Sequence, residues 1–163
     1  PILAGFTFRS DGKKQSSPEM DAFLASANIR LLRDEAVLLG GEVYLYGRPD
    51  AQRPGRGVEV RKTPAELVEG LDTDKPILVL DHQPRELEEL AAAGVDVDLC
   101  GHTHDGQMFP GNLTVRLFWE NACGCLRVGS MHSIVTSGVG LFGPNMRVAT
   151  RAEICPITIH FMN

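Results

Sequence analysis

The chain has 163 residues, of which 43% are hydrophobic and 23% are charged, and its formal net charge is -5. This length suits one domain with a real core, and the composition is that of an ordinary globular protein. The acidic balance argues against nonspecific nucleic-acid binding, because no basic excess exists to displace counterions from a phosphate backbone. No stretch approaches the ~20 apolar residues of a membrane-spanning helix, and no signal peptide is visible.

The chain begins on an apolar run at Pro1 without an initiator methionine, which indicates a processed or truncated product. The first half predicts strands over residues 2–8, 29–32, 36–39 and 43–46, the last two forming a hairpin around a Gly-Gly pair. Residues 9–17 are polar and are expected to form an exposed loop. One helix is predicted to begin at Ser17-Pro18, and a second at the capping-box pattern of Thr63 and Glu66, running to about Leu71.

A basic loop is predicted between these helices, over residues 47–57. It contains Arg48, Arg53 and Arg56 together with prolines and glycines. Exposed arginines of this kind are commonly just solvated and contribute little to stability. The alternative interpretation is that they contact an anionic substrate, since guanidinium groups bind phosphate and carboxylate well.

Two histidine-bearing strand ends stand out in the second half. Residues 77–80 are uniformly apolar, which is typical of a strand covered on both faces, and His82 follows directly. A helix over residues 86–94 leads to a second apolar strand, 95–99, which runs into Gly101-His102-Thr103-His104. A right-handed crossover would make these strands parallel, with both carboxyl ends at one edge of the sheet. We therefore expect His82, His102 and His104 to lie close together.

The rest of the chain predicts shorter elements. A helical turn is expected within residues 112–120, and strands over 126–128, 133–137 and 154–161, with a glycine-rich loop at 138–147. His132 and His160 match no ligand pattern and are interpreted as structural. The cysteines at positions 100, 123, 125 and 155 lack zinc-site spacing, so we interpret them as small buried thiols of a reducing compartment.

Three histidines at strand ends predict a first-row metal site suited to manganese, iron or zinc. A two-metal centre can clamp a phosphoryl group and activate water, but it normally includes a bridging carboxylate. Asp81 and Asp105 adjoin the histidines in sequence. Adjacent strand positions point to opposite faces of a sheet, so neither acid is well placed to bridge two ions.

The segment 77–84, Ile-Leu-Val-Leu-Asp-His-Gln-Pro, and the segment 101–107, Gly-His-Thr-His-Asp-Gly-Gln, resemble the closing motifs of the calcineurin-like metallophosphoesterases. Phe109-Pro110, residues 139–147 and residues 151–154 resemble the bacterial branch that is often tethered to the membrane by an N-terminal segment. The resemblance extends from about residue 23 to 161. It implies a cytoplasmic protein or one associated with the membrane through a missing N-terminal segment.

This resemblance implies an α/β (mixed α+β) fold, with residues 1–163 forming the C-terminal portion of a four-layer α/β/β/α sandwich. It implies hydrolysis of a phosphomonoester, phosphodiester or pyrophosphate bond at a dinuclear centre of divalent metals, manganese, iron or zinc. By motif, His82 and His102 would share one ion and His104 would hold the other. The substrate would be a phosphorylated small molecule or lipid, with Arg48 and Arg147 as candidate binding residues.

The sequence departs from the family pattern in its first half. The family's Asp-x-His, Gly-Asp and Asn-His motifs do not occur, so the bridging acid and the acid catalyst are expected upstream of Pro1. We therefore expect a partial or empty metal site, no turnover by this chain alone, and self-association through surface left uncovered. The alternative is a non-catalytic metal- or partner-binding module. Asp105 also replaces the branch's usual glycine, although aspartate tolerates left-handed backbone.

Overall fold

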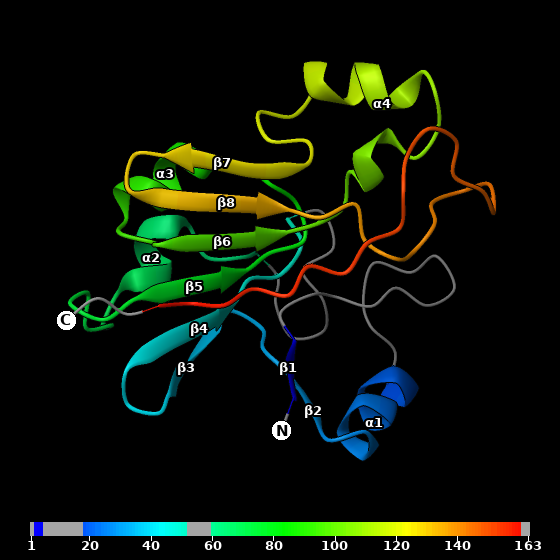
Figure 1. Cartoon of the computed structure of the whole chain (residues 1–163). Helices are drawn as coiled ribbons and strands as arrows, with labels where there is room; N and C mark the ends of the chain where they lie inside the picture. The colour runs from blue at the N-terminus through cyan, green and yellow to red at the C-terminus, as the bar shows by residue number, and fades with distance from the viewer. Residues whose placement is uncertain (1, 5–17, 52–59, 161–163) are drawn as a thin grey trace.

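The structure, a computed structural model, describes residues 2–4, 18–51 and 60–160. It is a mixed α/β protein, as the sequence predicted, built on one six-stranded sheet with the order β3-β4-β5-β6-β8-β7 (Figure 1). The other sheet in these residues is the two-stranded parallel pair β1-β2. The expected loop at 9–17, the Ser17 cap, Arg53 and Arg56 lie outside the described residues.

Most predicted elements are present with small shifts of their ends. The strands are β1 (Ile2–Ala4), β2 (Ile29–Leu31), β3 (Glu35–Leu39), β4 (Val43–Gly47), β5 (Ile77–Leu80), β6 (Val97–Cys100), β7 (Gly124–Val128) and β8 (Met131–Val135). The helices are α1 (Pro18–Ser26), α2 (Pro64–Val68), α3 (Leu87–Ala92) and α4 (Gly111–Thr114), with 3-10 turns η1 (His104–Gly106) and η2 (Val115–Leu117). None of the helices in the described ranges is long and apolar enough to cross a bilayer.

The capping box predicted for the second helix is confirmed. The Thr63 side chain accepts a hydrogen bond from the backbone N–H of Glu66, and the Glu66 carboxylate accepts one from the backbone N–H of Thr63. These bonds satisfy two amide donors that a helix start leaves without partners. The helix ends at Val68, three residues before the predicted Leu71.

The sheet brings four strand ends to one edge. Strands β4, β5, β6 and β8 are mutually parallel, while β3 and β7 run antiparallel at the two outer positions. The crossover from β5 through α3 to β6 therefore has the parallel arrangement that the sequence predicted. Figure 1 shows α4 and the orange segment 138–150 beyond the arrowheads of β6 and β8. This carboxyl edge is where ligands bind in open α/β sheets.

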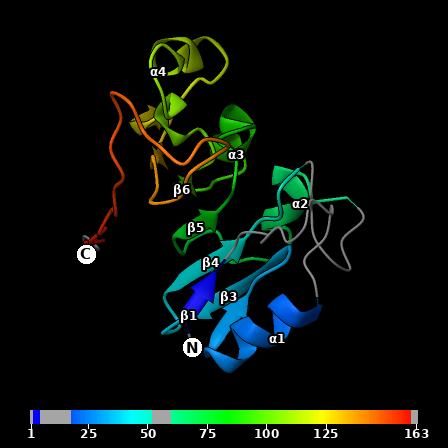
Figure 2. The same ribbon diagram turned by 90° about the vertical axis from the view of Figure 1, so that its right-hand side faces the viewer.

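The main core lies between one face of the sheet and helices α2 and α3 (Figures 1 and 2). Ile77 and Val79 of β5 are fully buried on that face. They pack with Leu67 of α2 and with Leu87 and Leu90 of α3. At about 1.5–3 kcal/mol for each fully buried aliphatic side chain, this cluster is the main apolar support of the strand that ends at His82.

Two sequence expectations are corrected. The predicted strand at 154–161 is absent over residues 154–160, where the chain has no regular structure, and Ile154 is 83% exposed. An apolar run becomes a strand only where a neighbour supplies its hydrogen bonds, and no described strand pairs with this segment. The four cysteines are free, but only Cys100 is buried, whereas Cys125 and Cys155 are exposed.

Candidate metal centre

Two of the three predicted histidines are in direct contact at the carboxyl edge. His82 follows β5 and His102 follows β6, and the Nδ1 atom of His102 lies 2.8 Å from the Nε2 atom of His82. The rings meet edge to face, with centroids 4.7 Å apart. The β-α-β connection thus places two imidazoles side by side, as its parallel topology required.

Asp50 adds a carboxylate to this pair. It lies in the segment after β4, is only 6% exposed, and its Oδ2 atom is 3.4 Å from Nε2 of His82. The side chain of Gln83 donates a hydrogen bond to the same oxygen at 3.1 Å. Sequence reasoning missed Asp50, although β4 neighbours β5, so a residue after β4 falls at the same sheet edge as His82.

The backbone at His82 is held by a buried carboxylate. The Oδ1 atom of Asp81 accepts hydrogen bonds from the N–H groups of His82 and Gln83, at 2.6 and 3.3 Å. Its Oδ2 atom faces Arg48 at 3.3 Å and Arg61 at 3.2 Å. Burial raises the pKa of Asp81, and the two guanidinium charges act against that rise. Asp81 therefore contacts the backbone of His82 and the two guanidinium groups.

Arg48 is placed differently from the solvated or substrate-facing residue that the loop pattern suggested. Its side chain is fully buried, pairing with Asp81 and, at 2.7 Å, with Glu86. Arg61, which sequence reasoning did not single out, bridges the same two carboxylates. The two arginines and two carboxylates form a charge-balanced cluster, which we call the ion cluster. A buried charge of this kind is tolerated only when paired and hydrogen-bonded.

The turn after β6 has an unusual backbone. His102, His104, Asp105 and Gln107 all have positive φ, between 50° and 71°, and they are half of the eight described non-glycine residues with this feature. Such residues typically cost of order 1 kcal/mol or more each and cluster at functional sites. The Asp105 in place of glycine adopts the left-handed backbone (φ 50°), as its side chain type allows.

His104 contacts the glycine-rich loop through Arg147 and Phe142. Arg147 donates to the carbonyl oxygen of His104 at 3.1 Å, and its guanidinium lies 3.5 Å from the Nδ1 atom of that histidine. On the other side, the ring of His104 stacks on Phe142 at 6.5 Å between centroids. Arg147, a predicted substrate-binding residue, thus fastens the glycine-rich loop to the histidine turn. It also donates to the carbonyl oxygens of Ser137 and Gly140.

Local electrostatics keep His102 and His104 neutral near pH 7. Burial lowers the pKa of His102 to about 4, helped by the neighbouring His82 and opposed by Asp50. Burial also lowers the pKa of His104, as does the charge of Arg147. A neutral imidazole is the form that binds a metal ion, because its nitrogen lone pair is then free.

The donor types at this edge fit a first-row transition metal, since imidazole nitrogen and carboxylate oxygen are both suitable ligands. The number of donors falls short. Within residues 2–4, 18–51 and 60–160, no group of three or more histidine, cysteine, aspartate or glutamate side chains is arranged to hold an ion. The described residues therefore do not form a complete metal site. His132 and His160 are exposed and take no part in it.

A second buried acid lies behind the centre. Asp98 of β6 is fully buried, and its Oδ2 atom accepts hydrogen bonds from the Cys100 thiol at 3.0 Å and the Ser133 hydroxyl at 3.5 Å. Its Oδ1 atom has no hydrogen-bond partner in the described structure. Burial raises the pKa of Asp98 to about 7, and the nearby charge of Asp81 adds to this effect.

Trp119 is a further residue that sequence reasoning missed. It follows η2, and its ring lies edge-on to His102 with centroids 5.2 Å apart. The Cζ atom of Arg85 lies 4.6 Å from the centroid of the same ring. No pattern around residue 119 announces this contact, because it depends on how the segment after α4 folds back over the sheet edge.

Comparison with known proteins finds several similar chains. An uncharacterized metallophosphoesterase of Aquifex aeolicus is 34% identical over 139 residues, which cover 84% of this chain and 53% of that protein. An uncharacterized metallophosphoesterase of Helicobacter pylori is 32% identical over 138 residues, covering 82% of this chain and 36% of the relative. A transmembrane protein with metallophosphoesterase domain from Danio rerio is 40% identical over 112 residues, which cover 65% of this chain and 24% of that protein.

The chain thus spans about half the length of the Aquifex relative and less of the other two. No family model matches the chain. No solved structure matches it either.

Proposed function

This chain belongs to the metallophosphoesterase family, and on that premise we propose that its histidine pair is one side of a divalent-metal centre that hydrolyses phosphoester or pyrophosphate bonds. The observation that carries the proposal is the 2.8 Å approach of His82 Nε2 and His102 Nδ1 at the carboxyl edge of the sheet. Two imidazoles brought together by separate strands suit a shared metal ion better than a purely structural role.

The proposed centre holds two ions of manganese, iron or zinc. His82 and His102 would hold one ion, and His104, which contacts Arg147, would hold its neighbour. When bound, such ions lower the pKa of water and stabilise charge on the phosphoryl oxygens.

The protein's own residues prepare this site in three ways. Asp81 fixes the backbone of His82 through its N–H group. Asp50 lies against the His82 ring and limits its orientation, as carboxylates commonly do for ligating histidines. Trp119 covers one edge of His102 and reduces access of solvent on that side.

We also propose that the chain of 163 residues does not turn over by itself. The support is the shortage of donors, since the described residues offer no cluster of three or more ligating side chains. The same observation favours the second candidate function, a non-catalytic module that binds a metal ion or a partner through the histidine pair.

For the whole protein we propose only a class of substrate and an association with the membrane. We propose a phosphorylated small molecule or a lipid phosphate as substrate. Association with a membrane is supported by the Danio rerio relative, which is described as a transmembrane protein. Partition of the whole natural protein into the membrane fraction of lysed cells, and its release by detergent, tests that part.

The principal experiment measures manganese-dependent hydrolysis of bis(p-nitrophenyl) phosphate by the whole natural protein, and manganese binding by this chain. The expected result is turnover that a chelator abolishes. His82→Gln is expected to reduce turnover by more than about 100-fold, since even residues that only support metal ligands contribute about 10- to 100-fold. His132→Gln is the matched control, because His132 is exposed on β8 and is expected to leave turnover unchanged.

Turnover that survives both the chelator and His82→Gln would refute the metal-centre proposal. Manganese binding that depends on His82, without turnover by the whole protein, would select the binding module. Rapid hydrolysis by the isolated chain would overturn the proposal that it is incomplete as a catalyst.

A further inference from the structure

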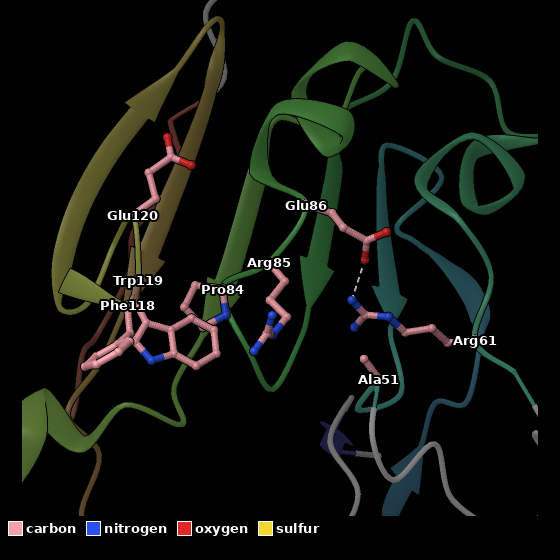
Figure 3. A pocket seen from close by; sticks show the side chains of 8 residues that line it. All are labelled: Ala51, Arg61, Pro84, Arg85, Glu86, Phe118, Trp119 and Glu120. Atoms are coloured by element: carbon pink, nitrogen blue, oxygen red, sulfur yellow. Dashed lines mark hydrogen bonds and ion pairs between the residues drawn. The ribbon is translucent and has the colours of Figure 1, made fainter. Parts of the chain in front are cut away.

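A pocket of about 480 Å³ opens between Trp119 and Arg61 (Figure 3). Its lining comes from the segments that follow β4 and precede α2, from the turn between β5 and α3, and from the segment after η2: Ala51, Arg61, Pro84, Arg85, Glu86, Phe118, Trp119 and Glu120. This volume lies within the roughly 300–1,000 Å³ of small-molecule sites and is much larger than one phosphoryl group needs. The pocket therefore has room for a substrate's remaining groups.

Trp119 connects the pocket to the proposed centre. Its ring lines the pocket and also lies 5.2 Å from the ring of His102. A phosphoryl group held at the histidines would thus have the pocket as its immediate neighbour. Arg85 lies over the same indole, with its Cζ atom 4.6 Å from the ring centroid, a contact that restrains the guanidinium.

The two arginines of the pocket differ in how their charges are compensated. Arg61 pairs with both Asp81 and Glu86, so it belongs to the neutral ion cluster. Arg85 makes no ion pair with any described residue, and its hydrogen bond goes from Nε to the neutral Oε1 of Gln83 at 2.7 Å. The terminal nitrogens of Arg85 are left for an external acceptor.

The acidic side chains of the pocket do not neutralise the charge of Arg85. Glu86 is engaged by Arg48 and Arg61. Figure 3 shows the carboxylate of Glu120 directed away from Arg85, while the guanidinium of Arg85 lies between Trp119 and Arg61. A positive group with several free donors, held beside an aromatic wall, is suited to a phosphate oxygen pair, which guanidinium binds in bidentate fashion.

We propose that this pocket binds a second anionic group of the substrate, with Arg85 as the specificity-determining residue, so that the preferred substrates are pyrophosphates or nucleoside diphosphates rather than phosphomonoesters. The inference rests on the proposed function, because the histidine pair is what makes the pocket the neighbour of a reacting phosphoryl group. Trp119 positions the Arg85 guanidinium, and the exposed ring of Phe118 offers a planar surface to whatever follows the second phosphate.

The test uses the fluorescence of Trp119, which is the chain's single tryptophan and lies in the pocket itself. The chain is titrated with orthophosphate, pyrophosphate and ADP in the absence of divalent metal, so binding is read independently of the proposed centre. Pyrophosphate and ADP are expected to bind at least about tenfold more tightly than orthophosphate. Arg85→Ala is expected to weaken pyrophosphate binding by about 10- to 100-fold, the range for hydrogen bonds between charged groups.

Two further variants sharpen the result. Arg85→Lys keeps the charge but loses the bidentate geometry and is expected to fall between wild type and Arg85→Ala. Arg127→Ala removes the same charge from exposed β7, at the opposite end of the sheet, and is expected to bind like wild type. Calorimetry repeats each titration, because Arg85→Ala also changes the surroundings of the indole.

Equal affinity of wild type and Arg85→Ala for pyrophosphate would overturn the inference, as would an equal loss in Arg127→Ala. Tighter binding of ADP than of pyrophosphate would support it and indicate that Phe118 contacts a base. If Arg85 controls binding but the whole protein hydrolyses nothing, the proposed function has failed and the anion pocket stands. If hydrolysis depends on His82 while Arg85 has no effect on binding, only the pocket inference has failed.

Discussion

Arg48 and Arg147 each hold the backbone beside a candidate metal-binding histidine, but they do so by different means. Arg48 is fully buried and acts through Asp81, whose other oxygen accepts the N–H of His82. Arg147 is only half-buried and donates directly to backbone carbonyl oxygens of His104, Ser137 and Gly140. The first support centres on an ion pair whose two side chains are fully buried, and the second is a set of bonds that water can replace.

The difference predicts how each side of the site responds to change. Removing one member of a buried ion pair leaves its partner charged and unsolvated, which is strongly destabilising. Carbonyl oxygens near the surface can instead be rehydrated when a donor is lost, so the effect is smaller and more local. The His82 side should therefore be tied to global stability, and the His104 side to the order of one loop.

The largest effect is expected for Arg48→Met. This change leaves Asp81 and Glu86 with Arg61 alone and should lower the free energy of unfolding by about 3–5 kcal/mol. Urea denaturation measures it. Arg30→Met is the matched control, because Arg30 pairs with Glu35 while both side chains are about half exposed, and exposed pairs contribute about 0–1 kcal/mol. Equal losses in the two variants would show that the ion cluster is not the stabilising feature.

The next effect concerns pH, through Asp98. Its pKa of about 7 in the folded chain exceeds that of an unfolded aspartate, so the folded state retains a proton that the unfolded state releases. Stability from this group is therefore present at acidic pH and is lost as the pH rises from about 4 to about 7, by up to about 4 kcal/mol. Asp98→Asn should remove this decline. The measurement is the difference in unfolding free energy between variant and wild type at pH 4.5 and pH 8.

A pH-independent difference between Asp98→Asn and wild type would mean that Asp98 is ionised in the folded protein. The charges that act on it come from the ion cluster, since Asp81 raises its pKa and Arg48 lowers it.

The smallest effect is expected for Arg147→Met. Loss of its carbonyl bonds should lower the free energy of unfolding by about 1–2 kcal/mol. Amide hydrogen exchange should accelerate at Ser137, Gly138 and Gly140 while β5 and β6 keep their protection. Exchange that accelerates equally in those two strands would contradict the local character of this support.

The sequence allowed the scaffold of the site to be predicted and left much of its surroundings unpredicted. The apolar strands before His82 and His102, with a helix between them, were enough to place the two imidazoles at one edge, because parallel crossovers follow a single hand. That His104 lies close to the pair stays a prediction, and the positive φ values at His102 and His104 were not foreseen. Backbone conformations of that kind in non-glycine residues leave no sequence pattern.

Asp50, Trp119 and Arg85 illustrate what local patterns miss. Asp50 reaches His82 because β4 neighbours β5, and Trp119 reaches His102 because the chain folds back after η2. Arg48 lies in a segment rich in glycine, proline and arginine, and this composition predicts exposure. Its side chain is nevertheless fully buried and pairs with two carboxylates from other elements. These contacts join residues that are far apart in the sequence, so local sequence patterns do not predict them.

The order of strands β6-β8-β7 also has a consequence for synthesis of the protein. Strand β8 pairs with both β6 and β7, so the edge of β6 stays open until the chain has grown from Cys100 to Val135, a further 35 residues. At about 5–20 residues per second this delay lasts roughly 2–7 s. A chain stopped before Met131 would keep an unpaired β6 edge and leave β7 without a neighbour. Early termination there would therefore produce an aggregation-prone polypeptide, because an unpaired strand edge can pair with another chain.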